Sequence, residues 1–97
     1  MIYHVTTEES WHKARRQGFY EAASLAAEGF IHCSSEEQVQ GVLDRYYRGQ
    51  KELLLLHIDE SKLIPALKYE LASSVNETFP HIYGPLNLDA VTGISNI

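Results

Sequence analysis

Cysteine, positive charge and long hydrophobic runs are all scarce in this sequence. Cys33 is the only cysteine, so no disulfide can form within the chain, which agrees with a reducing compartment. The longest apolar run is ELLLLHI, whereas a helix that crosses a bilayer needs about 20 apolar residues, so we expect no membrane span. The sequence begins in a strand-like pattern without the features of a signal peptide, and we therefore expect a cytoplasmic protein.

The scarcity of lysine and arginine limits the partners of the protein. Eight of these residues stand against thirteen aspartates and glutamates, which gives a net charge of -5. An acidic surface repels phosphate backbones, so we expect no nucleic-acid partner. At 97 residues, without a linker or a low-complexity segment, residues 1–97 are expected to form one domain. A chain of this size buries roughly 60 to 70% of its unfolded surface.

The first helix is expected from a capping pattern. Thr6 with Glu9 forms the S/T-x-x-E signature of a capping box. The helix that it opens should turn Trp11 inward and run to about Gln17, where Gly18 is the expected residue to end it.

A second helix follows from the same kind of pattern. Ser34 with Glu37, or Ser35 with Gln38, forms another capping box. Apolar residues then recur at spacings of three and four, which predicts an amphipathic helix up to Gly49.

Strand patterns account for most of the remaining chain. Five stretches are typical of strands: residues 1–6, 29–34, 52–59, 67–72 and 91–97. The four consecutive leucines in the third of them predict a strand buried on both faces, at the centre of a sheet. Pro80, Gly84 and Pro85 interrupt FPHIYGPL, which we therefore expect to be an ordered loop. The expected fold class is α+β, a single small domain with a mixed β-sheet and two main helices.

One strand-to-helix unit occurs twice, as IYHVTTEE and FIHCSSEE. Because strand side chains alternate, His4 and Thr6 share one face of the first unit, and His32 and Ser34 share one face of the second. Neighbouring imidazole and hydroxyl groups can hold a sugar diol or a carboxamide, so these four residues are candidate ligand-binding groups. The alternative is that the hydroxyls only cap the two helices and that the histidines are hydrogen-bonded structural groups.

A second cluster of candidate functional side chains lies in NETFPHIYG. Phe79, His81 and Tyr83 bring together an aromatic surface, an imidazole and a phenol, and they are further candidates for ligand binding. Glu77 in this segment and Glu70 on the strand LKYELA are the candidate catalytic carboxylates. The alternatives are that the aromatic rings anchor the loop to the core and that Glu70 faces solvent.

The remaining reactive side chains favour structural roles. A metal site built from His4, His32 and His81 is a further alternative, but no HxxH or CxxC spacing supports it, and we expect no metal. Strand alternation places Cys33 on the face opposite His32, where it belongs to the core instead of acting as a nucleophile. His57 lies in the leucine-rich strand and is expected to be a core histidine.

The motifs YHVT, EGFIHCS and FPHIYGPL resemble, over nearly the whole chain, those of domain-of-unknown-function family nine-five-two. They are also similar to the core of the ADP-ribosyltransferase-like fold, in which a first-strand histidine and a second-strand hydroxyl or aromatic residue hold NAD and a later glutamate often does chemistry. This resemblance implies an ADP-ribosyltransferase-like fold with His4 as the first histidine. His32 and Ser34 match the His-x-Ser strand of the tRNA 2'-phosphotransferase branch, and Glu70 or Glu77 stands for the glutamate.

Two functions are compatible with these features. The first is an enzyme or enzyme-like domain that binds NAD or a related nucleotide and cleaves or transfers ADP-ribose. The alternative is a non-catalytic module that binds a small metabolite or a partner protein in the same pocket. The sequence specifies no oligomeric state.

Overall fold

The first helix begins later than the capping pattern predicts. The computed structural model describes residues 1–97. Strand β1 spans Ile2–Thr7 and is followed directly by α1, Glu8–Gln17. The N-cap is Thr7, whose hydroxyl oxygen accepts the N–H of Ser10 at 3.0 Å. The prediction that Thr6 caps this helix is therefore wrong, because the Thr6 side chain is buried and its hydroxyl is hydrogen-bonded to Tyr20.

The second capping box is the one that begins at Ser35. The side-chain oxygen of Gln38 accepts the N–H of Ser35 at 3.0 Å. A single 3₁₀ turn, Glu36–Gln38, then leads into α3, which spans Val39–Tyr46 and ends three residues before Gly49. Thr6 and Ser34, the hydroxyl residues that share a face with the two histidines, therefore do not cap a helix.

A short helix lies between these two and was not expected. Helix α2 spans Ala23–Glu28, within the stretch of small residues. Gly29 ends it in the left-handed conformation at φ 91°, in the same way as Gly18 ends α1 at φ 95°. Glycine adopts this conformation without the steric cost that a side chain imposes, so both helices end where glycine occurs.

The strands form three sheets, with the orders β1-β4-β8, β3-β6-β5 and β2-β7. Every pairing is antiparallel, in place of the single mixed sheet that we expected. Strand β4 lies between two neighbours, as its leucine run predicts. The bounds are β2 Phe19–Tyr20, β3 Ile31–His32, β4 Leu53–Ile58, β5 Ala66–Ala72, β6 Glu77–Tyr83, β7 Leu86–Asn87 and β8 Val91–Asn96, with 3₁₀ turns at Glu60–Lys62 and Leu88–Ala90.

Residues 79–83 of the segment predicted to be a loop belong instead to β6, the central strand of its sheet, whereas Gly84 and Pro85 lie outside the strands. Pro80 lies inside this strand and pairs with Tyr69 of β5. Toward the other side, the carbonyl oxygen of Pro80 accepts the N–H of Cys33 at 3.0 Å. Because the N and C=O of one residue point to the same side of an antiparallel strand, the missing N–H of Pro80 also faces this side. Because β3 ends at His32, the missing N–H of Pro80 removes only one hydrogen bond, at the end of the pairing between β3 and β6.

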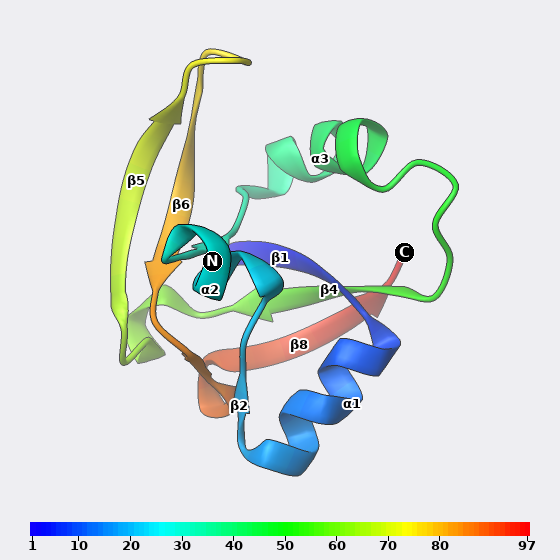
Figure 1. Ribbon diagram of the computed structural model, residues 1–97, viewed down its shortest axis with the longest axis vertical. Helices are drawn as coiled ribbons and strands as arrows, with labels where there is room; N and C mark the ends of the chain where they lie inside the picture. Colours follow the sequence, from blue (N-terminus) through cyan, green and yellow to red (C-terminus); the bar gives the residue numbers. More distant parts are fainter.

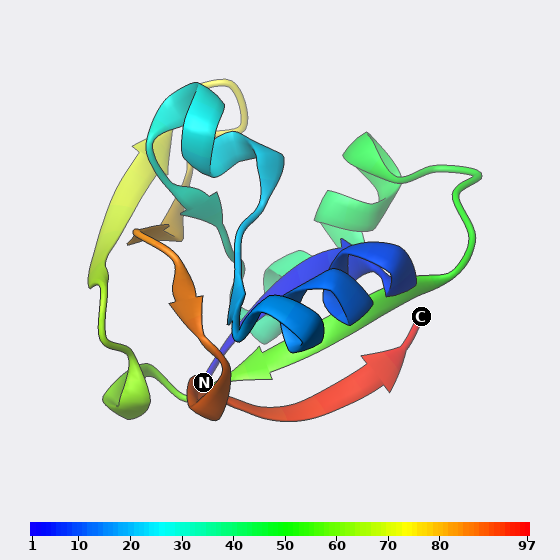
Figure 2. The same ribbon diagram turned by 60° about the horizontal axis from the view of Figure 1, so that its bottom comes forward.

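The two larger sheets meet where β1 passes the end of β3. Tyr3 and Ser34 exchange both backbone hydrogen bonds there, with N to O distances of 2.8 and 2.7 Å. Figure 1 shows α1 and α3 on opposite sides of β1, and the β5–β6 pair rising along the margin of the molecule. Figure 2, turned by 60° from this view, shows α2 next to β3. Residues from both sheets therefore come together around β1, β3 and α2.

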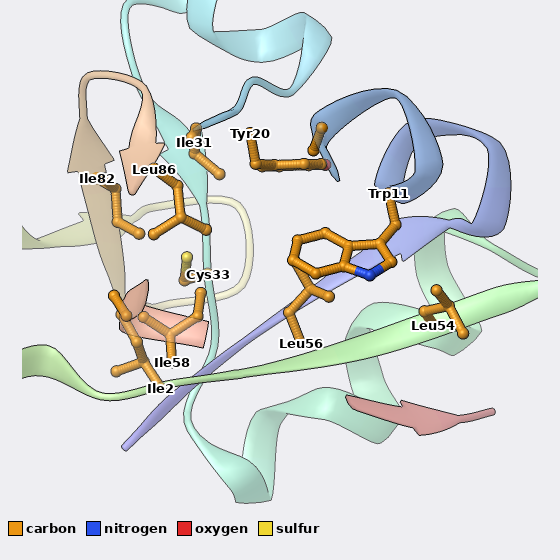
Figure 3. Close-up of a cluster of buried hydrophobic side chains, with 12 residues drawn as sticks. Ile2, Trp11, Tyr20, Ile31, Cys33, Leu54, Leu56, Ile58, Ile82 and Leu86 are labelled. Carbon is orange, nitrogen blue, oxygen red and sulfur yellow. The ribbon is translucent and has the colours of Figure 1, made fainter. Parts of the chain in front are cut away.

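The hydrophobic core lies under this junction. Figure 3 shows the Trp11 indole of α1 over Leu56 of β4, and Cys33 near Ile82 of β6. Ile31 and Cys33 are almost completely buried in the same cluster, which confirms that this face of the β3 segment is turned into the core. No helix of the chain combines the length and the apolar character needed to cross a bilayer.

Candidate functional site

The three histidines singled out in the two motif regions line one cavity. His4 comes from β1, His32 from β3 and His81 from β6. The cavity has a volume of about 790 Å³, within the range of small-molecule sites. Three other predicted site residues also line it, namely Thr6, Ser34 and Phe79.

His4 is buried, and both of its ring nitrogens are hydrogen-bonded within the protein. Nδ1 lies 2.5 Å from the backbone carbonyl oxygen of His32, and Nε2 lies 2.7 Å from the hydroxyl of Tyr20. The Tyr20 hydroxyl lies 2.9 Å from Oγ1 of Thr6. His4 therefore belongs to a polar network that joins β1, β2 and β3, as expected of a structural histidine.

The protons of this network can be assigned. A carbonyl oxygen only accepts, so Nδ1 of His4 carries a hydrogen and donates it. Nε2 of the neutral ring then accepts the hydroxyl hydrogen of Tyr20, and the bond between the two hydroxyls is donated by Thr6. Burial lowers the pKa of His4 to about 4 and raises the pKa of Tyr20 to about 12, so both groups are neutral near pH 7.

His32 lies at the rim of the cavity, with 52% of its side chain exposed. Its Nε2 lies 3.0 Å from Oε2 of Glu28, the last residue of α2. The Phe30 ring packs against His32 at a centroid distance of 4.8 Å and stacks on His81 at 4.0 Å with an interplanar angle of 19°. The rim therefore places aromatic rings next to a carboxylate.

His81 is oriented by a carboxylate from the neighbouring strand. Its Nδ1 lies 2.7 Å from Oε1 of Glu70, and the hydroxyl of Tyr83 donates to the same oxygen. These two bonds, the one from Tyr83 being the larger cause, lower the pKa of Glu70, and the pKa of Tyr83 is raised by the same contact. Glu70 therefore stays a carboxylate that fixes the hydrogen on Nδ1 and leaves Nε2 of His81 for a ligand.

The wall of the cavity carries negatively charged side chains but no lysine or arginine. Its formally charged groups are the carboxylates of Glu21 and Glu28. A phosphate or carboxylate inside the cavity would lack the cationic partner that usually holds such a group. A positively charged aromatic ring, in contrast, would meet carboxylates and aromatic faces.

Three of the predicted site residues lie outside the wall of the cavity. Glu70 and Tyr83 are connected to it through His81. Glu77 lies at the start of β6, where its carboxylate accepts the side-chain amide of Gln38 at 3.2 Å. Of the two candidate catalytic carboxylates, Glu70 is thus the one in contact with a group that lines the cavity.

Sequence reasoning missed the lining residues that contact the three histidines, namely Tyr20, Glu28 and Phe30. Strand alternation contained a signal for Phe30, because it lies two residues before His32 and shares its face. Tyr20 and Glu28 had no such signal, since they come from a strand of two residues and from a helix of six.

The histidines do not assemble a metal site. No group of three His, Cys, Asp or Glu side chains is placed to hold a metal ion. Both nitrogens of His4 are already bonded to protein atoms. His4 therefore has no ring nitrogen left for the metal ion of the alternative interpretation.

Comparisons with known proteins identify relatives. The sequence profile of a family described as "Protein of unknown function (DUF952)" matches residues 5–94. The fold is similar to the crystal structure of protein CC0527 from Caulobacter crescentus, with a TM-score of 0.89 and 36% identity over 98% of this chain and 83% of that chain. The solution NMR structure of the same protein gives a TM-score of 0.84 and 36% identity over 99% and 83% of the two chains. No curated protein matches the chain significantly.

Proposed function

The chain belongs to this family of proteins of unknown function, and we propose that its cavity binds NAD or a related nucleotide by the nicotinamide riboside end. The observation that carries the proposal is a cavity with aromatic rings, imidazoles and carboxylates but without lysine or arginine. The oxidised nicotinamide ring is a cationic aromatic ring, whereas the diphosphate of NAD is anionic. The nicotinamide end therefore matches the cavity, and the diphosphate is expected to lie in solvent beyond the rim.

The wall of the cavity supplies a contact for each part of this ligand. The stacked rings of Phe30 and His81 offer a flat surface for the nicotinamide ring, and Glu28 offers a negative charge at the rim. Nδ1 of His32 and the hydroxyl of Ser34, which does not cap a helix, suit the hydroxyls of the ribose. His4 and Thr6 hold β1 and β3 in place beneath them.

The Glu70–His81 pair suits this site to one reaction, the cleavage or transfer of ADP-ribose. Nε2 of His81 accepts a proton from water or an acceptor hydroxyl, and the oxygen forms a bond to C1' of the ribose. The bond from C1' to the ring nitrogen breaks, and its electron pair neutralises the pyridinium, so that nicotinamide leaves as a neutral molecule. Glu70 acts in this scheme through Nδ1 of His81, as a positioning residue.

Binding is tested by titrating the protein with NAD while the histidine NMR signals are observed. We expect the signals of His32 and His81 to move, and the signal of His12 on the exposed face of α1 to stay. Nicotinamide mononucleotide should cause the same shifts, and ADP-ribose should not. His32→Ala should weaken binding, and His12→Ala is the matched control. Unmoved His32 and His81 signals at millimolar NAD would refute the proposal.

Catalysis is tested by measuring the nicotinamide released from NAD, with and without added acceptors. Glu70→Gln should lower the rate, up to the roughly 10²- to 10⁴-fold that general-base catalysis contributes, while NAD affinity is retained. Glu77→Gln is the matched control, because Glu77 contacts Gln38 and not His81. Bound NAD that stays intact would favour the alternative, a non-catalytic binding module, and would exclude the reaction.

A further inference from the structure

Strand β5 is a free edge with an unusually apolar outer face. It has one neighbour, β6, and lies along the margin of the molecule in Figures 1 and 2. Tyr69 and Leu71 are 56% and 63% exposed there. The Tyr69 ring is already fixed, because its hydroxyl donates to Glu60. Exposed apolar edge strands favour pairing with another strand, and proteins usually protect them.

The pairing with Pro80 shows where the backbone groups of β5 point. The Pro80 carbonyl is directed away from β5, toward Cys33, so Tyr69 and Pro80 form a non-hydrogen-bonded pair. The N–H and C=O of Tyr69 therefore point out of the sheet, and those of Leu67 and Leu71 follow with the period of two. No other backbone segment of the chain bonds to these three residues at the free edge.

The sequence of β5, ALKYELA, is self-complementary about Tyr69. When two copies run antiparallel with Tyr69 opposite Tyr69, Lys68 of each copy faces Glu70 of the other. Leu67 then faces Leu71, and the outward N–H and C=O groups of both strands are in register. Opposite charges across a strand pair stabilise it.

We propose that two copies of this chain pair through β5, antiparallel and about a two-fold axis at Tyr69. The β3-β6-β5 sheet of one copy then joins the same sheet of the other copy to form one continuous sheet. The interface is isologous, as in most homodimers. Charge selects this register over its neighbours. A two-fold axis at Lys68 or at Glu70 keeps the backbone in register but places like charges opposite each other.

The interface also touches the candidate site. Glu70 uses Oε1 for His81 and Tyr83, which leaves Oε2 for Lys68 of the partner subunit. Within its own chain, the Lys68 ammonium lies 4.8 Å from the centroid of the Tyr83 ring, on the face of the sheet that carries Glu70. The dimer thus adds a positive charge beside the carboxylate that orients His81.

Sedimentation velocity between micromolar and millimolar concentrations tests the proposal. The mass should rise with concentration from 11.0 kDa to twice that value. Lys68→Glu replaces two attractive contacts by two repulsive ones and should raise the dissociation constant about tenfold or more. Lys51→Glu makes the same change of charge at an exposed site outside β5, and it should leave the dimer intact.

A second variant tests the backbone pairing. Tyr69→Pro removes one N–H that points to the free edge and none that bonds β6, so dimerisation should be lost while the circular dichroism of the monomer is kept. In the wild type, the amides of Leu67, Tyr69 and Leu71 should exchange more slowly as concentration rises. A chain that stays at 11.0 kDa throughout overturns the proposal, as does a dimer that survives Lys68→Glu.

Discussion

Lowering the pH from 7 to 5 is expected to destabilise this protein through His4. Burial lowers the pKa of His4 from its ordinary 6.5 to about 4 in the folded chain. Between these values the unfolded chain binds a proton that the folded chain does not. The stability provided by neutral His4 is therefore present above pH 6.5 and lost as the pH falls toward 4. For one group with these two pKa values, linkage gives a loss of about 2 kcal/mol between pH 7 and pH 5.

The free energy of unfolding is measured by urea denaturation at several pH values in this window. Fluorescence of Trp11, the single tryptophan, reports unfolding because its side chain is buried in the core. Asp59 and Glu70 also have lowered pKa values, but the unfolded carboxyls titrate near 3.8 and 4.5, so their contributions are lost mainly below pH 5. Measurements above pH 5 therefore avoid the contributions of these two carboxyls.

A matched pair of variants identifies the group. His4→Gln keeps a neutral donor and acceptor at this position and should remove the part of the slope that His4 causes. His12→Gln, on the exposed side of α1, should keep the wild-type slope. The reasoning is refuted if the wild type and His4→Gln lose stability in parallel between pH 7 and pH 5.

Three further predictions follow from other contacts. Tyr20→Phe leaves a buried imidazole nitrogen and a buried hydroxyl without a partner, and should cost about 2 kcal/mol in urea denaturation, whereas Tyr46→Phe at an exposed site should cost almost nothing. Cys33 should react with a thiol reagent at pH 8 only after unfolding, because burial raises the pKa of its thiol; rapid reaction of the native protein would contradict this. Gly84→Ala should destabilise more than Gly49→Ala, by about 1 kcal/mol, because both have positive φ but only at Gly84 does the new Cβ come within 2.9 Å of another side chain. Equal losses in thermal denaturation would show that this contact relaxes without cost.

Local patterns in the sequence predicted several elements correctly. The leucine run forms the central strand β4, Gly18 ends α1, and Cys33 faces the core. Each of these follows from hydrophobic periodicity or from the conformational freedom of glycine, which act within a few neighbouring residues. The capping pattern was less decisive, because Ser34 and Ser35 both satisfy it in the second unit, and in the first unit Thr6 satisfies it although the N-cap is Thr7. Long-range contacts decided between the neighbours: the Thr6 hydroxyl bonds to Tyr20, which leaves Thr7 as the N-cap, and Ser34 pairs with Tyr3, which leaves Ser35.

The strand β6 shows where local reasoning fails. Proline and glycine in FPHIYGPL predict a loop, and the structure has a strand up to Tyr83. The cost of Pro80 depends on which side its missing N–H faces and on whether a neighbour needs it. That information lies in the short length of β3, which is distant in the sequence.

The sequence by itself determined that His4 and His32 share faces with hydroxyl residues, and it marked His81 as a third candidate, because side-chain alternation and composition are local properties. Only the tertiary structure decided the different roles of these imidazoles. Burial next to β2 lowers the pKa of His4, and His32 lies at the rim of the cavity. Nδ1 of His81 is hydrogen-bonded to the carboxylate of Glu70 on β5. The physical reason is that burial and hydrogen-bond partners fix the protonation of a histidine, and both come from strands far away in the sequence.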